Sequence, residues 1–351
     1  INFQINKLIH VWGVDFDTVT ECLPPLITMG ISVAKYVNGI LQVEKIRKIL
    51  RFIKNDTERL MNRPEHKVLH YYALEGRKAV EFFTMFILIS MLIFLIPPIS
   101  ITIHDIVTKK NLSTRHVMFQ ADYNVDPANF YYFISFHCYL TTFVTLALLT
   151  ALDTMYIFFI QHACALFAIT GYRLKTIHIL NESVLQDDYD FETYKNKEFT
   201  AEEQKQIHRK LIDSIREHKK FHNNLSLKYD VLSCYSLLSR AQFSQIVMKM
   251  GNIDDIMMLG VWECGLIVHL FALCFPGQRL LNFSEQVYYD SLECMWQPLF
   301  KKSQIMYQVL VLKSIKPLKL TALKVTTLTL ETFLSVMQSA MSYFTVLLST
   351  L

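Results

Sequence analysis

One uncharged stretch decides the fold: Phe82 to Ile103, which reads FFTMFILISMLIFLIPPISITI. In a helix that rises about 1.5 Å per residue, these 22 residues extend about 33 Å, enough to cross a hydrocarbon core of about 30 Å. A helix in the core of a soluble protein can be apolar on every side, but it is rarely this long. The stretch therefore predicts a transmembrane helix.

Several other stretches of the chain are almost as poor in charge. Between Pro127 and Tyr172 the only Asp, Glu, Lys or Arg is Asp153, and the last twenty residues carry none of the four. Because backbone groups in lipid must be satisfied within the segment, these stretches are expected to be helices rather than strands. We predict an all-α polytopic membrane bundle whose six visible spans lie near residues 18–40, 79–103, 129–168, 228–250, 254–277 and 321–351.

The composition agrees with a membrane protein. Hydrophobic residues make up 52% of the 351 residues and charged residues only 19%, against about 25% charged in soluble proteins. The mean hydropathy of +0.25 excludes an ordinary soluble enzyme. Twenty-five Phe and 17 Tyr against nine Gly and nine Pro exclude a disordered or linker-rich chain.

The basic residues of the loops set the topology. Successive loops between the predicted spans hold ten, three, eleven, one and six Lys and Arg, an alternation typical of the positive-inside rule. The loops at 41–78 and 171–228 are therefore expected in the cytoplasm and the C-terminus outside. Two spans within 127–172 would move every later loop to the other side of the membrane and so place the most basic loop outside. One long helix is therefore expected there. Since the first span enters from outside, a further span is expected upstream. The basic excess then reflects topology, and no nucleic-acid partner is expected.

The last predicted span has a polar edge. Polar residues recur there at alternating spacings of four and three, which places them within about 40° of one direction on a helix. Small residues on such an edge favour close helix packing, whereas an amide and a carboxylate on the same line favour a water-filled pore. One narrow edge cannot enclose a pore, so the second interpretation requires a ring of subunits. The edge comprises Glu331, Ser335, Gln338, Ser342, Thr345 and Ser349, which Thr327 joins.

The predicted outer halves of the other spans are rich in aromatic residues and methionine. This pattern is typical of an aromatic belt at the lipid interface, and also of an apolar cavity for a small hydrophobic ligand.

For Asp153, Arg240 and Glu263, which fall inside or near spans, a structural role is favoured. No Gly-rich phosphate loop, nucleophile motif or zinc signature is present, so neither an enzyme, a cofactor nor a metal is expected. Asn111 lies in a predicted outer loop and is a candidate for glycosylation.

Several short motifs stand out in the C-terminal third. They are Cys274-Phe275-Pro276-Gly277-Gln278, Trp296, Lys316-Pro317-Leu318, the stretch from Leu328 to Phe333, and Ser342-Tyr343-Phe344. These motifs resemble those of the insect odorant receptors, both in their order and in their distance from the terminus. The stretch from Tyr71 to Arg77 is similar to the family's cytoplasmic entry to its third span.

The resemblance implies a seven-helix subunit with a cytoplasmic N-terminus in the full-length chain. Such subunits form a tetrameric cation channel, a heterotetramer with the odorant co-receptor, in the plasma membrane of olfactory sensory neuron dendrites. A small hydrophobic volatile odorant is the implied ligand. Residues 1–299 would form the bundle with the odorant pocket and cytoplasmic loops, and residues 300–351 would supply a cytoplasmic anchor helix and the pore-lining last helix.

The same resemblance implies site residues, which are assigned from the positions that they hold in the matching motifs and spans. The implied pore residues are Gln338, Ser342, Val346, Ser349 and Thr350. The implied ligand-binding residues are Ser90, Met91, Phe94, Tyr131, Ile134, His137, Met258 and Trp262.

Two other functions compete with this one. A G-protein-coupled type of chemoreceptor would have the opposite orientation, which the loop charges disfavour, and its Asp-Arg-Tyr and Asn-Pro-x-x-Tyr motifs do not occur. A membrane transporter would need paired internal repeats with broken helices, and the sequence shows none.

Overall fold

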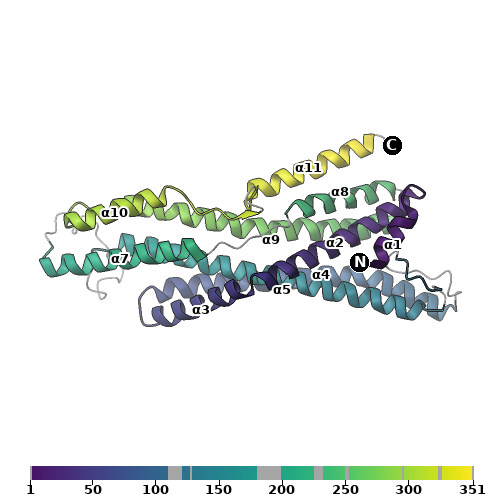
Figure 1. Ribbon diagram of the computed structural model, residues 1–351, viewed down its shortest axis with the longest axis horizontal. Coiled ribbons are helices and arrows are strands. Elements are labelled where there is room, and N and C mark those ends of the chain that lie inside the picture. The colour runs from purple at the N-terminus through teal and green to yellow at the C-terminus, as the bar shows by residue number, and fades with distance from the viewer. Residues whose placement is uncertain are drawn as a thin grey trace.

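The computed structural model describes residues 2–109, 121–126, 129–179, 199–224, 232–249, 253–294, 296–322 and 326–349. It is an elongated bundle of long helices (Figure 1), which confirms the predicted all-α class. The helices are α1 (Asn2–Val11), α2 (Phe16–Leu41), α3 (Val43–Leu60), α4 (His66–Val107), α5 (Tyr131–Lys175), α7 (Ala201–Asn224), α8 (Leu232–Met248), α9 (Ile253–Leu292), α10 (Lys301–Ser314) and α11 (Leu330–Ser349).

Each of the six predicted spans coincides with a helix. The most informative is α5, which continues without a break for 45 residues, or about 68 Å, so the uncharged stretch around it is one helix and not two. Within the described residues, α5, the part of α9 from Leu259 and α11 are long and apolar enough to cross a membrane. The helices α2 and α3 meet at a bend of 67° and together meet the same criterion.

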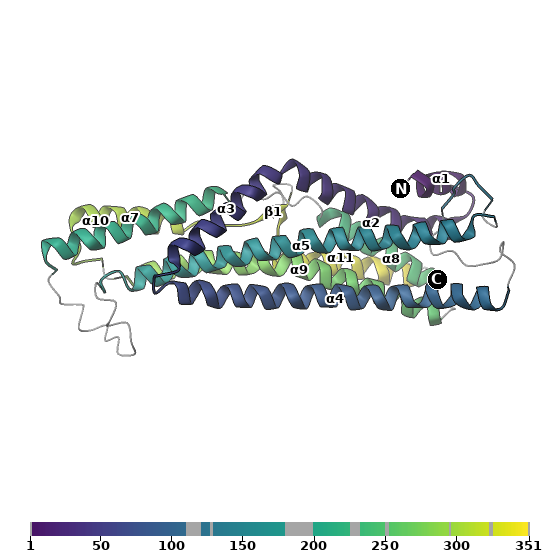
Figure 2. The same cartoon turned by 90° about the horizontal axis from the view of Figure 1, so that it is seen from below.

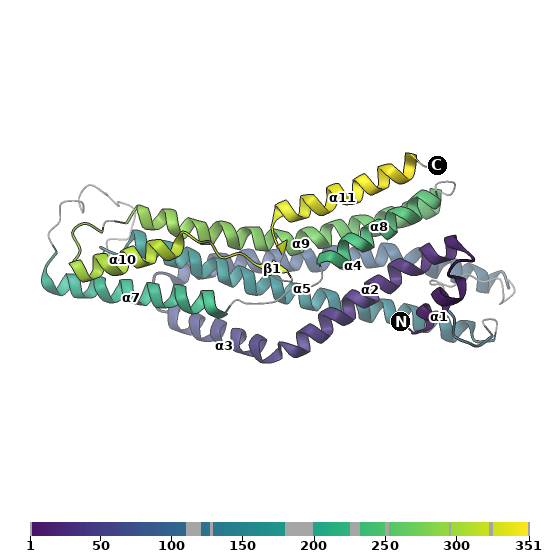
Figure 3. The ribbon, with the colours of Figure 1, turned by 45° about the horizontal axis from the view of Figure 1, so that its top comes forward.

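The two ends of the bundle differ. Helix α1 and the end of α11 lie at one end, while α7 and α10 lie at the other (Figures 1 and 3). Following the predicted topology, we call the first the outer end and the second the inner end. Helices α4 and α5 run side by side over most of the length (Figure 2), and α5 also packs along α9. Helix α11 lies against α8 and α9 on the outside of the bundle.

The start of the last span differs from its prediction. Helix α11 begins at Leu330, nine residues later than expected, because a short antiparallel pair precedes it, β1 (Thr321–Ala322) with β2 (Thr326–Thr327). Thr327 belongs to this pair and therefore does not extend the polar edge of the helix. Threonine is β-branched and favours extended backbone, which explains why the helix does not start earlier.

Ion pairs join the helices at the inner end. Arg173 Nε on α5 donates to Glu65 Oε1 at 2.7 Å, just before α4. Burial alone would raise the pKa of Glu65, but this hydrogen bond and the nearby guanidinium lower it below its usual value. Lys175 Nζ lies 3.0 Å from carboxylate oxygens of Asp290 on α9 and of Glu293 just after it, and these contacts raise the pKa of Lys175.

Candidate ligand cavity and pore helix

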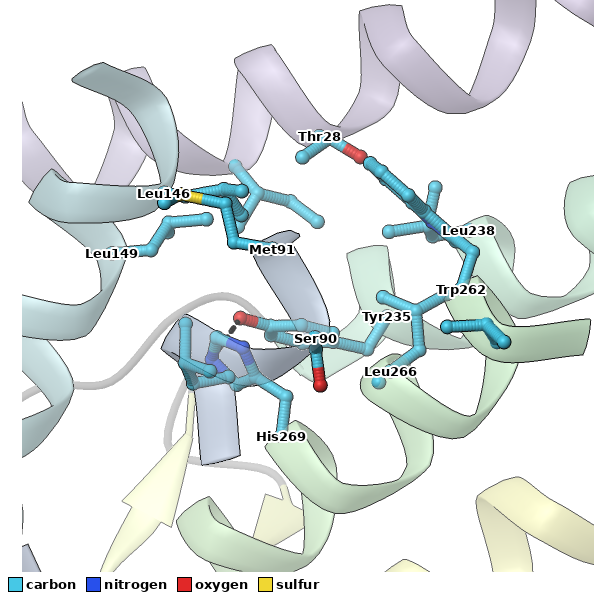
Figure 4. A pocket seen from close by; sticks show the side chains of 14 residues that line it. Thr28, Ser90, Met91, Leu146, Leu149, Tyr235, Leu238, Trp262, Leu266 and His269 are labelled. Atoms are coloured by element: carbon cyan, nitrogen blue, oxygen red, sulfur yellow. Dashed lines mark hydrogen bonds between the residues drawn. The ribbon is translucent and has the colours of Figure 1, made fainter. Parts of the chain in front are cut away.

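A cavity lies between α2, α4, α5, α8 and α9. It holds about 670 Å³ of space free of protein atoms, a figure that includes open solvent at its mouth. Its walls are mainly aliphatic, with a few polar groups (Figure 4). The lining residues are Thr28, Ile31, Ile87, Ser90, Met91, Leu146, Leu149, Tyr235, Leu238, Val261, Trp262, Gly265, Leu266 and His269.

Helical spacing explains why these residues share one space. On each contributing helix the lining positions are three or four apart, such as Thr28 and Ile31 on α2 or Tyr235 and Leu238 on α8, so each helix turns one face to the cavity. Gly265 on α9 enlarges the cavity, since a Cβ placed there would meet no described atom within 4 Å. The lining is therefore set by helix faces that meet in the bundle and not by a contiguous motif.

A buried ionic network, formed by Lys35, Asp153, Tyr235 and His269, closes the inner end of the cavity. Lys35 Nζ donates to Asp153 Oδ1 at 2.7 Å, and both side chains are almost fully buried. Asp153 Oδ2 lies 2.6 Å from His269 Nε2. Because an ionised carboxylate only accepts, Nε2 carries the proton in this contact.

The network reaches the cavity through two of its members. Tyr235 Oη lies 3.0 Å from His269 Nε2, and both side chains line the cavity. The four residues come from α2, α5, α8 and α9, so the network joins four walls at one point. The predicted structural role of Asp153 agrees with this pairing. Lys35 and His269 were not singled out from the sequence, because nothing in it shows that residues more than 100 positions apart meet.

The other two intramembrane charges have neighbours on adjacent helices. Ser239 on α8 donates a hydrogen bond to Glu263 on α9. Arg240, the next residue of α8, donates to Ser339 on α11. Both charged residues therefore connect α8 to a neighbouring helix, α9 in one case and α11 in the other.

The structure places the predicted ligand-binding residues in different regions. Ser90, Met91 and Trp262 line the cavity, whereas the side chains of Phe94 and Met258 lie outside what the structure describes. Tyr131, Ile134 and His137 lie further toward the outer end, since Ile134 precedes the lining residue Leu146 by about three turns of α5.

The outer group has contacts of its own. Tyr131 and Ile134 are buried, and Tyr123 Oη lies 2.8 Å from His137 Nδ1. The involvement of this group in ligand binding stays a prediction. Asn111, the candidate glycosylation site, also lies outside the described residues.

Sequence reasoning missed most of the cavity wall. Leucine, isoleucine and valine at helical spacing are typical of any buried helix face, so no local signal marks them as lining residues. Tyr235 and His269 were also missed, although a histidine in an otherwise charge-free part of α9 is a signal that deserves weight. The unpredicted lining residues are Thr28, Ile31, Ile87, Leu146, Leu149, Tyr235, Leu238, Val261, Gly265, Leu266 and His269.

The polar edge of α11 faces away from the rest of the chain. Glu331, Ser335, Gln338, Ser342, Thr345 and Ser349, hereafter the polar stripe, are all exposed. Of the other predicted pore residues, Val346 is 60% exposed and Thr350 lies outside the described residues.

The opposite side of α11 packs against its own subunit. Ala340 is fully buried, and the rings of Phe344 and Phe243 on α8 lie 5.0 Å apart. On α9, Phe271 makes an edge contact with Phe333. Helix α11 thus attaches by a mainly apolar face, to which the Arg240–Ser339 hydrogen bond also belongs, and leaves the polar stripe without cover from the described part of its own chain.

Comparison with known proteins identifies the family. A sequence profile of the family described as 7tm Odorant receptor matches residues 15–341. The chain belongs to the odorant receptor family. The long apolar helices and this membership together make it a multi-pass membrane protein.

Individual odorant receptors are distant relatives. The chain is 24% identical over 223 residues to Odorant receptor 13a of Drosophila melanogaster, covering 60% of this chain and 51% of that protein. It is 22% identical over 171 residues to Putative odorant receptor 92a of the same species, covering 46% of this chain and 40% of that protein. The chain thus spans about half the length of the curated relatives it matches.

Solved structures support the same architecture. The insect olfactory receptor OR5 from Machilis hrabei in complex with eugenol aligns with a TM-score of 0.74 and 11% identity, over 100% of this chain and 86% of that chain. A second structure of the same receptor aligns with a TM-score of 0.69 and 11% identity, over 100% and 85%. At this identity the likeness concerns the fold, and it confirms the predicted odorant-receptor type of helix bundle.

Proposed function

We propose that this chain is a subunit of an odorant-gated cation channel, in which an odorant binds the cavity and α11 lines the pore. The observation that carries the proposal is the orientation of α11. Its polar stripe is exposed while its opposite face packs on α8 and α9. A polar stripe on a membrane helix is unfavourable against lipid, so water or another subunit must cover it. A pore lined by several copies of α11 provides both the water and the neighbouring subunits.

The cavity supplies the ligand site of this proposal. Its size and mainly aliphatic walls suit a small hydrophobic molecule, whose burial contributes about 25 cal/mol per Å² of apolar area. The related OR5 from Machilis hrabei was solved in complex with eugenol, a small molecule of this kind. Such a ligand opens the channel only if it binds the open arrangement more tightly than the closed one.

Helix α10 supplies the contact between subunits. Ser303, Tyr307, Leu310 and Ser314 face inward and are buried. On the opposite face, Ile305, Val309 and Leu312 are 55%, 42% and 67% exposed. An exposed apolar face of this kind is typical of an interface. It supports an anchor at the inner end that holds four subunits, including the odorant co-receptor, around one axis in the plasma membrane of the olfactory dendrite.

Whole-cell recording from cells that express the chain with the co-receptor tests the proposal. We expect a cation current evoked by part of a broad volatile panel. In the variant Gly265→Leu the new side chain fills the cavity, and the half-maximal odorant concentration should rise about tenfold or more.

The matched control is Gly260→Leu on the same helix. A Cβ at Gly260 also meets no described atom within 4 Å, but Gly260 does not line the cavity, so odorant responses should persist. The absence of any odorant-evoked current, or an equal effect of the two substitutions, would contradict the proposal.

A further inference from the structure

We infer that the inner end of the cavity is a hydrogen-bonding subsite that selects neutral ligands carrying one oxygen function, such as an alcohol, a ketone or a phenol, over hydrocarbons and ions. The inference rests on the proposed function only in taking the cavity as the ligand site. It adds the chemical class of ligand and the residues that select it, Tyr235 and His269.

Three of the polar lining residues form a group, while the hydroxyl of Thr28 and the indole of Trp262 lie apart from it (Figure 4). Ser90, Tyr235 and His269 lie close together on one side, while Leu146, Leu149 and Met91 form an apolar wall beside them (Figure 4). A ligand with a hydrocarbon body and one oxygen atom matches this division. Its body would lie along the aliphatic wall and its oxygen beside the phenol and the imidazole. The phenol is able to donate or accept a hydrogen bond, whereas the imidazole, whose Nε2 proton is directed at Asp153, offers only Nδ1 as an acceptor.

The buried ionic network fixes this polar side. His269 Nε2 is held by Asp153 Oδ2 at 2.6 Å and lies 3.0 Å from Tyr235 Oη. Lys35 Nζ contacts both oxygens of Asp153, at 2.7 and 3.0 Å, and lies 5.5 Å from the centre of the Tyr235 ring. The phenol and the imidazole are therefore held in place before a ligand arrives. A site ordered in advance loses less conformational freedom on binding, which favours affinity.

The same network argues against charged ligands. Lys35 and Asp153 already pair one positive with one negative charge, and their side chains are 3% and 1% exposed. A carboxylate or ammonium group placed beside them would add a buried charge without a free counter-ion, and such a charge is costly to desolvate. A neutral oxygen atom brings no such cost and gains a hydrogen bond. A hydrocarbon forms no hydrogen bond with the polar side of the cavity.

The test measures binding rather than current, so a failure to gate does not affect it. The purified receptor in detergent is melted with increasing concentrations of five forms of one carbon skeleton: hydrocarbon, alcohol, ketone, carboxylate and ammonium. A ligand that binds the folded state raises the melting temperature in a concentration-dependent way. The variant Gly265→Leu shows which part of the effect comes from the cavity.

For the unsubstituted receptor we expect the alcohol and ketone to bind about tenfold more tightly than the hydrocarbon, and the two ions more weakly than the alcohol. In Tyr235→Phe, which removes one hydroxyl and keeps the ring, the preference for alcohol over hydrocarbon should fall to about twofold or less. The control Tyr156→Phe removes another buried hydroxyl, one that donates to Leu273 O at 3.1 Å and does not line the cavity, so the preference should persist.

Three results would overturn the subsite: equal binding of hydrocarbon and alcohol, tighter binding of the carboxylate than of the alcohol, or an unchanged preference in Tyr235→Phe. The first two need no variant, so the inference can fail even if Tyr235→Phe does not fold. Binding with the expected preference but without any current would contradict the channel and leave the subsite supported.

Discussion

At Gly277 and Gln278, two neighbouring residues of α9 position the start of α11. A Cβ at Gly277 would lie 2.1 Å from the carbonyl oxygen of Leu328, so only glycine allows the backbone before α11 to approach this closely. Gln278 Oε1 accepts a hydrogen bond from the backbone nitrogen of Leu330 at 3.3 Å, where α11 begins. The family motif at 274–278 thus has a physical purpose, which is to hold the segment that leads into α11.

The substitution Gly277→Ala tests this contact. The new methyl group would meet backbone atoms, which cannot move aside cheaply, so we expect a loss of about 1–3 kcal/mol of stability. Gly30→Ala in α2 is the control, because a Cβ there meets no described atom within 4 Å and alanine favours the helix. Melting of the detergent-solubilised protein should show a lower midpoint for the first variant and an equal or higher one for the second. Equal midpoints for both variants would contradict the account.

Single residues also mark the limit of sequence reasoning. Asp153 could be recognised as a charge within an apolar stretch, and a structural role could be predicted for it. Its partners Lys35 and His269 could not be assigned, since they lie on other helices and only the packing of the bundle brings them together. The same applies to the cavity, where Ser90, Met91 and Trp262 were expected and the aliphatic wall was not.

At the scale of whole helices the sequence was more informative. Gaps in charge located all six predicted spans, and the alternation of basic loops identified α5 as a single helix. The strands β1 and β2 were not predicted, because a strand of two residues is too short to show a periodic pattern in the sequence. The bend between α2 and α3 was likewise unpredicted, although Asn38-Gly39, a pair typical of turns, stands just before Gln42 where the helices meet.

The orientation of α11 can be tested by cysteine accessibility. With the exposed native Cys264 replaced by serine, Ser342→Cys and Ser349→Cys should react with a charged thiol reagent applied outside, because a pore supplies the water in which the reactive thiolate forms. Leu348→Cys lies at the depth of Ser349 but about 100° around the helix from it, and should react about tenfold more slowly. The loss of odorant-evoked current reports the reaction, and equal rates at positions 348 and 349 would contradict a pore along the polar stripe.

At the scale of the whole molecule, the unsatisfied surfaces indicate an assembly. The polar stripe of α11 and the apolar face of α10 lie toward opposite ends of the bundle, and a ring of subunits would cover both at once. Substituting Leu312→Glu places a charge on the apolar face of α10 and should shift the complex from tetramer to smaller species by size-exclusion chromatography with light scattering. The control Lys313→Glu places a carboxylate at an exposed position about 100° around the helix from Leu312 and should leave the tetramer intact. If the tetramer persists in Leu312→Glu, the contact between subunits does not run through the apolar face of α10.

The buried ionic network has a consequence for how the chain is made. Lys35 leaves the ribosome 118 residues before Asp153, a delay of about 6–24 s at 5–20 residues per second. During that interval α2 carries a lone ammonium group. A lysine at the centre of a membrane helix costs about 2.5–3.5 kcal/mol on insertion, and for Lys35, six residues before the end of α2, the cost is smaller but still unfavourable. The nascent α2 is therefore best kept beside the translocation machinery or at the lipid boundary until α5 emerges and supplies its counter-charge.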